Sequence, residues 1–543
     1  MTMANMGRQN LKPRKGAKTP SRLNHMVTVT VLWGAVVAGA VLGRILDEPA
    51  GTTGGGSTEG EVYSSHPDIE RAQLEAWGSE FFQPPFSSHR HTPSRTELLQ
   101  RFPRRQRTFV TSASSPAYNN NERASSNTRH YEVESVDTGS LDAVVKPENL
   151  EWMLTNIFSY PRNHNTNETA KEGAKKYILD SFQVTSGLQT ALQHFKPLQF
   201  LSIYDGYSLP QGANIIGILE GSEWGTANDR PTLVGAHWDT VAFTPGTDDN
   251  GSGTAAMLEA ARAISHSGCT PKYSLIFVAF DLEEVGSQGS LLFIKDFLSQ
   301  ILKTDSPHDV PLERFQGAFI MDTIMNMNET EGSQTFPRDW SLLLPDVYDV
   351  VADAGYRGDF LSMIYRKSVD GGLAERFVKH WDQRNSLGPS FRLQPFPLAL
   401  GKELPEMQTL ADHLNFLRSD HSRFWYMNDT AMPTSLKAVL MTDTGPYRGN
   451  MRNCYHTVCD GPEVSVLNNP TNLKFLAKIT QVLTDTLIDM SQCDIKSSSS
   501  STTNLHHNFV KTNNVHAKSA TSQRTSESPL RNLLNFVRWM EFS

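Results

Sequence analysis

Short apolar runs and amphipathic runs alternate along the middle of the chain, from about residue 146 to 492. The run SLIFVAF at 274–280 is nearly continuous, which is typical of a strand buried on both faces. The apolar runs predict strands at 212–222, 232–237, 274–280, 315–322 and 435–443. Runs with helical periodicity predict helices at 168–182, 252–264, 291–302 and 472–490. The alternation predicts an α/β domain with a mostly parallel central sheet and helices on both faces.

The amino-terminal pattern is different. Residues 1–25 contain Lys and Arg but no acidic residue, and an uncharged apolar run follows from Val27 to Gly43. A run of this length is at the short limit for a membrane-spanning helix, and the basic residues before it would face the cytosol. We therefore expect a signal-anchor transmembrane helix and a single-pass type II membrane protein, with its body in a Golgi or other endomembrane lumen or at the cell surface. The alternative is a signal peptide cleaved near Ala38-Gly39-Ala40 and a secreted protein.

Composition divides the chain into segments. The expected order is a basic cytosolic tail at 1–25, the anchor at 26–46, a low-complexity stem at 47–145, the α/β domain at 146–492 and a polar tail at 493–543. Glycosylation sequons at Asn167, Asn328 and Asn428 fit a body in the secretory pathway, so we expect a glycoprotein. Asn250 also begins a sequon, but we expect it to be unmodified because it lies in a candidate metal loop.

Charge and cysteine content exclude some classes of protein. The chain has 50 Lys and Arg against 58 Asp and Glu, a formal net charge of −8. This mild acidity argues against a nucleic-acid partner, because neutralising phosphates requires a basic surface. Four cysteines are too few for a disulfide scaffold. A hydrophobic content of 38% is too high for a fully disordered chain.

Acids and histidines stand where the predicted strands end. His237 and Asp239 end one strand, Glu283 and Glu284 follow the next, Asp322 ends a third, and Asp248, Asp249 and His456 lie in loops beyond the strands. Because the carboxyl ends of parallel strands share one edge of a sheet, these side chains should meet in one crevice. That many carboxylates repel one another, so either some are protonated or cations lie among them.

Two imidazoles with several carboxylates suit Zn²⁺, although mixed nitrogen and oxygen ligands also admit Mn²⁺ or Co²⁺. The ligands exceed the need of one metal, which predicts two ions sharing a bridging carboxylate. The sequence contains neither a G-x-S-x-G nucleophile elbow nor an H-E-x-x-H helix. The chemistry predicted for the crevice is therefore hydrolysis by metal-activated water.

Six motifs, in order, carry a resemblance to a known family. They are GAHWDT at 235–240, GTDDNGSG at 246–253, FDLEEVGSQGS at 280–290, the strand end at Asp322, SDHSRFW at 419–425 and YHTVCD at 455–460. Over roughly residues 150–490 the chain resembles the co-catalytic zinc aminopeptidases, which include bacterial leucyl aminopeptidases and aminopeptidase Y. The resemblance implies a zinc exopeptidase fold and a metallo-aminopeptidase, a hydrolase that removes the N-terminal residue of a peptide substrate.

The resemblance also implies ligands for two zinc ions. Asp249 would bridge the ions, His237 and Asp322 would hold one of them, and Glu284 and His456 would hold the other. The loop that follows His456 departs from the usual pattern of the family, because it continues as CDGPEVSVL.

Roles for further residues follow from the same resemblance. Glu283 would be the general base, Asp239 would orient the imidazole of a ligand, and Asp420 would line the substrate pocket. Cys454 and Cys459 bracket the histidine of the last motif. They are either bonded, which would stiffen the ligand loop, or two free thiols.

Other functions remain open. The chain also resembles the related glutaminyl-peptide cyclotransferases, but these use one zinc ion and carry a longer insertion after the Glu-Glu pair, where EEVGSQGS is compact. A non-catalytic ectodomain on the same fold is a second alternative, against which the complete ligand set argues. A carboxypeptidase is a third, and it would need a basic pocket for which Arg418, Arg423 and Arg448 are candidates.

Overall fold

The computed structural model describes residue 97 and residues 143–164, 166–197, 211–303, 311–386, 391–429 and 432–493. All of them belong to the first of two units, Met1–Lys496, and the second unit is Ser497–Ser543. The expected basic tail and anchor, and nearly all of the expected stem and polar tail, lie outside the described residues.

The expected membrane location requires a correction. Within the described ranges, no helix combines the length and the apolar character needed to cross a bilayer. The longest described helix, α16 (Pro470–Met490), carries charged residues such as Lys474, Lys478 and Asp485 along its length. The run from Val27 to Gly43, on which the single-pass type II location with a lumenal or extracellular body rested, lies outside the described residues. The structure therefore does not support the anchor, and it offers no support for glycosylation.

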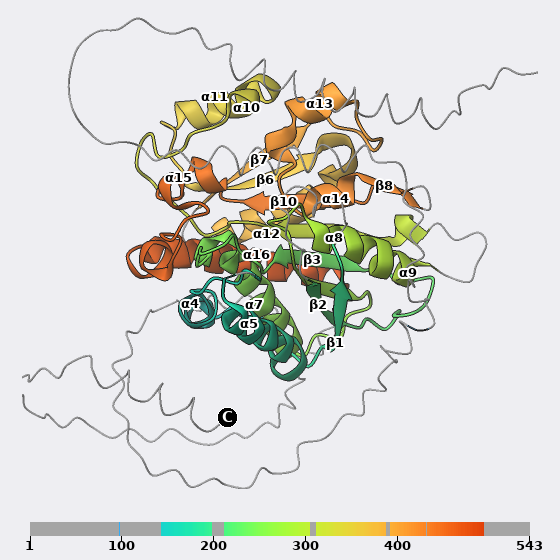
Figure 1. Ribbon diagram of the computed structural model, residues 1–543. Coiled ribbons are helices and arrows are strands. Elements are labelled where there is room, and N and C mark those ends of the chain that lie inside the picture. Colours follow the sequence, from blue (N-terminus) through green and yellow to red (C-terminus); the bar gives the residue numbers. More distant parts are fainter. Residues whose placement is uncertain are drawn as a thin grey trace, which may run out of the picture. The chain divides into compact units, whose positions relative to one another are not determined.

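An eight-stranded sheet runs through the described part of the chain in the order β1-β2-β4-β3-β5-β10-β6-β7 (Figure 1). Its strands are β1 Gln189–Phe195, β2 Gly212–Leu219, β3 Thr232–His237, β4 Leu275–Phe280, β5 Gly317–Met321, β6 Phe360–Arg366, β7 Arg392–Leu398 and β10 Ala438–Thr442. The neighbours β4, β3, β5 and β10 are parallel, and so are β6 and β7. The pairs β1–β2, β2–β4 and β10–β6 are antiparallel, so the sheet is mixed rather than mostly parallel. A separate hairpin pairs β8 (Met427–Asp429) with β9 (Met432–Thr434).

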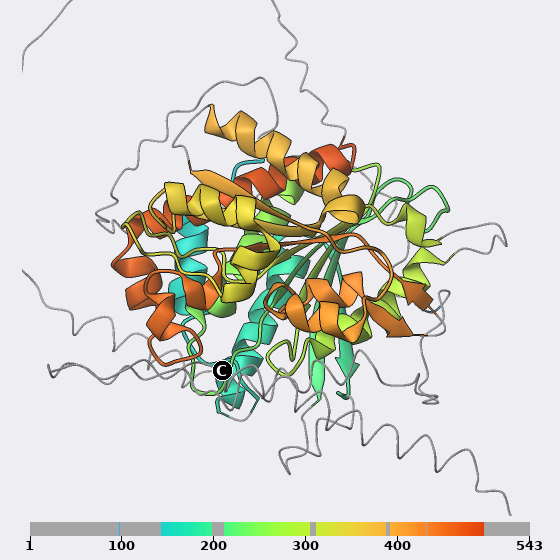
Figure 2. The same cartoon turned by 90° about the horizontal axis from the view of Figure 1, so that it is seen from above.

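Helices cover both faces of the sheet, as predicted (Figure 2). Besides α16, they are α4 Pro147–Asn156, α5 Glu168–Asp180, α7 Gly253–His266, α8 Gln288–Phe293, α9 Ser299–Leu302, α10 Arg338–Leu343, α11 Pro345–Asp353, α12 Lys367–Asn385, α13 Met407–Asp412, α14 His421–Trp425 and α15 Met451–Cys454. Successive side chains of a strand point to opposite faces. Accordingly, Phe277 and Ala279 of β4 join the core that includes α7 and α16, whereas Ile276 and Val278 join the core that includes Phe424 of α14.

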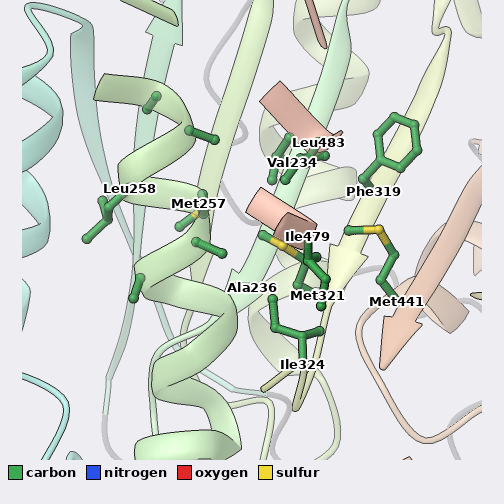
Figure 3. Close-up of a cluster of buried hydrophobic side chains, with 14 of the residues drawn as sticks. Val234, Ala236, Met257, Leu258, Phe319, Met321, Ile324, Met441, Ile479 and Leu483 are labelled. Atoms are coloured by element: carbon green, nitrogen blue, oxygen red, sulfur yellow. The ribbon is translucent and has the colours of Figure 1, made fainter. Parts of the chain in front are cut away.

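The core on the first face is a close layer of aliphatic and sulfur-containing side chains. Figure 3 shows Met257 of α7 and Ile479 of α16 against Val234 of β3 and Met321 of β5. These four side chains are fully buried. This layer packs against one face of the parallel strands and holds them rigidly. Their carboxyl ends therefore form a rigid edge on which a site can be built.

Strand register aligns the ends of the parallel strands. His237, the last residue of β3, lies opposite Phe280, the last residue of β4. Ala236 lies opposite Met321, the last residue of β5. The residues that follow β4 and β5 therefore emerge at the level of His237, as the sequence predicted.

Candidate metal centre

The structure brings the predicted ligands together in two overlapping groups. One group contains His237, Asp249 and Asp322, the other contains Asp249, Glu284 and His456, and within each group the ligand atoms all lie within 4.8 Å of one another. Asp249 belongs to both groups, because its Oδ1 is 3.3 Å from Nε2 of His237 and its Oδ2 is 3.2 Å from Nε2 of His456. One carboxylate between two imidazoles is an arrangement that a pair of cations can share.

The remaining distances complete each group. Nε2 of His237 lies 3.5 Å from Oδ1 of Asp322, and Nε2 of His456 lies 3.3 Å from Oε2 of Glu284. Oδ2 of Asp249 and Nε2 of His456 are buried, yet neither makes a hydrogen bond within the described residues. Buried polar atoms almost always have a partner, and imidazole nitrogen and carboxylate oxygen are ordinary zinc donors. The residues therefore fit zinc.

Asp249 is held in place from two sides. It lies in the turn η3 (Thr247–Ser252), and its peptide bond to Asn250 is cis. The carboxylate of Asp460 accepts hydrogen bonds from the backbone N–H groups of Asp248 (2.9 Å) and Asp249 (3.0 Å). The buried guanidinium of Arg162 donates to the carbonyl oxygen of the residue before the turn. The sequence reading did not single out Asp460, although it ends the YHTVCD motif.

Asn250 ties the same turn to the next strand. Its Oδ1 accepts the N–H groups of Gly253 and Thr323, and its Nδ2 donates to the carbonyl oxygen of Met321. The side chain is fully buried, which places it out of reach of a modifying enzyme. This burial agrees with the expectation that Asn250 is unmodified.

Asp239 connects the histidine of β3 with the acids that follow β4. Its carboxylate accepts the N–H of Glu283 at 3.1 Å and that of Glu284 at 3.3 Å. Its Oδ1 lies 3.5 Å from Nδ1 of His237. The carboxylate therefore faces the ring nitrogen of His237 that points away from Asp249, which is where a residue that orients the imidazole has to stand.

Glu283 and Asp420 lie beside the two groups rather than within them. Oε2 of Glu283 is 4.0 Å from Nε2 of His237. Asp420 is fully buried in the loop before α14, and burial raises its pKa to about 7, with Asp239 and Asp322 adding to the effect and His237 opposing it. Asp420 also raises the pKa of Glu283. The resemblance assigned Asp420 to the substrate pocket. In the structure, Asp420 is close enough to Glu283 to influence its charge.

The electrostatics show how crowded the carboxylates are. Burial raises the pKa of Glu283 well above its usual range, and Asp322 adds to the effect. Burial, followed by Asp249, does the same to the pKa of Glu284. Burial lowers the pKa of His237, but the neighbouring carboxylates outweigh it and raise that pKa well above the usual value. The acids can all be ionised only if positive charge is placed among them.

One consequence is that the stability of the protein, once a chelator has removed any metal, should fall as the pH rises towards neutral. Burial raises the pKa of Asp420 and of Asp460 from 3.8 to about 7. The folded state then holds more protons than the unfolded state between these values, so its stability falls as the pH rises from about 4 to about 7. We expect the melting temperature of EDTA-treated protein to decrease from pH 5.5 to pH 7.5, and that of zinc-loaded protein to change less. Asp420→Asn should flatten the slope, and equal slopes with and without zinc would contradict the interpretation.

His456 projects from a short bonded loop. Cys454 and Cys459 form a disulfide, which decides between the two alternatives left open by the sequence. His456 itself has a positive φ of 58°. The ring of Tyr455 stacks on the imidazole with centroids 3.8 Å apart. The loop, the ring and the disulfide together fix the direction of the His456 side chain.

The two disulfides should have separable effects. Cys454–Cys459 closes a loop of sequence separation 5 around His456, whereas Cys269–Cys493 closes one of 224. Because the entropy removed from the unfolded chain grows with loop length, replacing the long-range pair by serines should cost about 2–5 kcal/mol of stability. Replacing the short-range pair should cost less stability but lower zinc content and kcat. Melting curves and metal analysis of the two double variants check this, and the same loss of zinc in both would contradict it.

Tyr455 is a functional candidate that the sequence reading missed. Burial raises the pKa of its phenol well above 10, and the carboxylates of Asp249, Glu284 and Asp322 add to this shift while Arg418 opposes it. The phenol therefore stays protonated at neutral pH, and it lies close enough to the two ligand groups for their charges to raise its pKa. Its position beside the histidine in YHTVCD was the available signal.

Residues 214–355 match the peptidase family M28. This part of the chain is therefore similar to the M28 peptidases. The predicted resemblance to zinc aminopeptidases is thus confirmed, and the expectation of a metallopeptidase is supported. The M28 segment includes four of the five predicted ligands, and His456 lies beyond it.

Curated relatives and solved structures are similar to parts of this chain. It is 27% identical over 245 residues to the uncharacterized protein YfbL of Escherichia coli, which is 43% of this chain and 61% of that protein. It is 45% identical over 87 residues to aminopeptidase YwaD of Bacillus subtilis, which is 16% of this chain and 18% of YwaD. The solved structure of BSAP, a zinc aminopeptidase from Bacillus subtilis, is 14% identical with a TM-score of 0.41 and covers 64% of this chain and 95% of that one. The chain thus spans about three fifths of YfbL and under a fifth of YwaD.

Proposed function

We propose that this chain is a zinc-dependent exopeptidase that hydrolyses the N-terminal residue from peptides. The observation that carries the proposal is the position of Asp249 between the imidazoles of His237 and His456, with Glu283 beside the first of them. The carboxylate of Asp249 can be shared by two cations, and the carboxylate of Glu283 lies next to them as a group that can accept and donate a proton.

Two zinc ions would be held by the two groups. His237, Asp249 and Asp322 would bind one ion, and Asp249, Glu284 and His456 would bind the other. When bound, zinc lowers the pKa of a water molecule and polarises a carbonyl group.

Glu283 is the general base in this proposal. It accepts the proton of the attacking water and then donates it to the amine that leaves as the C–N bond breaks. Burial and neighbouring acids raise its pKa, which favours the protonated form needed in the second step, and cations among the ligands would oppose this shift and favour the ionised form needed in the first. Asp239 holds the ring of His237 in orientation through Nδ1.

The acidic surroundings select the end of the peptide that reacts. Asp420 belongs to neither ligand group, so its carboxylate, when ionised, attracts a free, positively charged amino terminus even with cations bound. The phenol of Tyr455, which stays protonated, can donate a hydrogen bond to the carbonyl oxygen as negative charge develops there. Both features favour attack on the first peptide bond.

Two of the three arginines considered for a carboxypeptidase pocket serve the fold. Arg448 is fully buried and donates to Gln334 Oε1 and to the carbonyl oxygen of Phe360. Arg423 is also buried and donates to the carbonyl oxygen of Gly286. These contacts favour an aminopeptidase over a carboxypeptidase.

The test is metal analysis of the purified full chain together with a panel of aminoacyl arylamides. We expect release of the arylamine only from substrates with a free α-amine, loss of activity on chelation, recovery with zinc, and about two zinc ions per chain. N-acetylated substrates serve as the matched control. Cyclisation of N-terminal glutamine without hydrolysis would assign the chain to the cyclotransferases instead, and zinc-loaded protein that turns over neither substrate would make it a non-catalytic ectodomain.

A further inference from the structure

The turn between β4 and α8 carries the proposed base, and it is unusually well fixed. The N–H groups of Gly286 and Ser287 both donate to the carbonyl oxygen of Glu283 at 2.8 Å. The guanidinium of Arg423, from α14, donates to the carbonyl oxygen of Gly286 at 2.6 Å. The backbone on both sides of the Glu283 side chain is therefore anchored, within the turn and to a neighbouring helix.

The side chain of Glu283 is held as well. The hydroxyl of Ser287 donates to Oε1 of Glu283 at 3.2 Å, while Oε2 faces His237 at 4.0 Å from its Nε2. Ser287 is fully buried. The final torsion of a glutamate side chain is broad, so a carboxylate without such a contact samples many orientations. The hydrogen bond to Oε1 removes this freedom and keeps Oε2 toward the ligand groups.

The backbone at Ser287 gives a second, independent observation. Its φ is +52°, in the left-handed region that glycine enters at little cost and other L-residues enter rarely. The backbone alone would be served better by glycine. Because serine is strained at this φ, we infer that the contact of its hydroxyl offsets the cost of the backbone conformation.

We propose that Ser287 is a positioning residue for the base. Its hydroxyl orients the Glu283 carboxylate so that Oε2 stays directed at the attacking water. This inference rests on the proposed function, because it takes Glu283 as the base. The other hydrogen bonds given for Ser287 come from its backbone: its N–H donates to the carbonyl oxygen of Glu283, and its carbonyl oxygen accepts from Ser290 Oγ and Leu291 N. Those contacts do not depend on the hydroxyl.

Two substitutions separate positioning from a structural role. Ser287→Ala removes the hydroxyl and keeps the strained backbone, whereas Ser287→Gly removes the hydroxyl and relieves the strain. Because misplacing a catalytic group slightly is costly, both variants should lose about 10- to 100-fold in kcat, with KM and zinc content nearly unchanged. The glycine variant should melt at or above the temperature of the wild type, also after chelation.

Matched variants make each outcome interpretable. Ser299→Ala removes another buried serine hydroxyl, one bonded to the carbonyl oxygen of Lys295, and should leave kcat unchanged. If kcat of Ser287→Gly equals that of the wild type, or if kcat falls only in proportion to lost stability or lost zinc, Ser287 does not position the base. An inactive wild type, or an active Glu283→Gln, would instead overturn the proposed function, so the two failures are distinguishable.

Discussion

Glu283→Gln should abolish turnover while the protein keeps its zinc. The amide is nearly the same size as the carboxylate but cannot accept a proton from water, so we expect kcat to fall by about 10³-fold or more. Glu283 belongs to neither ligand group, and removing its charge lessens the repulsion among the remaining acids. Zinc content should therefore stay at the level of the wild type. Hydrolysis of an aminoacyl arylamide, measured beside metal analysis of the same sample, checks both parts.

A glutamate outside the site provides the control. Glu375 lies on the exposed side of α12, and Glu375→Gln should match the wild type in kcat and in zinc content. Activity that survives in Glu283→Gln would remove Glu283 from the mechanism. Loss of zinc together with activity would show that Glu283 acts as a ligand rather than as a base.

Asp249→Asn should have the second large effect, because it removes the one residue that both groups share. An amide is a weak zinc ligand, and its NH₂ group would turn a donor toward one of the imidazoles. We expect zinc to fall from about two ions per chain to less than one, with kcat reduced by about 10³-fold or more. Metal analysis after dialysis against a defined free-zinc buffer measures the loss.

Variants of ligands that belong to one group give the contrast. Asp322→Asn and His456→Ala each disrupt a single group, so each should retain close to one ion. Retention of both ions by Asp249→Asn would exclude a bridging role. Loss of both ions from the two single-group variants would show that the groups bind zinc only together.

The parallel centre of the fold could be predicted because its strands are buried on both faces. β3, β4, β5 and β10 read as apolar runs, and each lies within or close to its predicted range. Three strands of the eight-stranded sheet were missed, namely β6 and the two edge strands β1 and β7. β1 is largely half-exposed and lacks an apolar run, and β7 contains Pro395 and Pro397, which are tolerated in an edge strand but disguise it in a sequence. Of the antiparallel pairs, β1–β2 and β10–β6 each include a missed strand, whereas β2–β4 joins two predicted ones. The direction of such pairs depends on partners that are distant in the sequence.

The metal ligands could be predicted because their residue types and their order along the chain indicate metal binding. The five expected ligands converge because they follow strands that end at one edge. The residues that support them were harder to see. Arg162 reaches the site across 84 positions of sequence, and Asp460 contacts the backbone of Asp249 from 211 positions away. The hydroxyl of Ser287 meets Glu283 only because the backbone turns into a left-handed conformation.

The order of the ligands along the chain has a consequence for biosynthesis. One group is complete once residue 322 has been made, whereas the other lacks its imidazole until residue 456. A ribosome must therefore add a further stretch of polypeptide, including β6, β7 and β10, before the second group can close. A chain released in that interval carries four of the five ligands but only one complete group, so synthesis itself imposes a sequence on the assembly of the site.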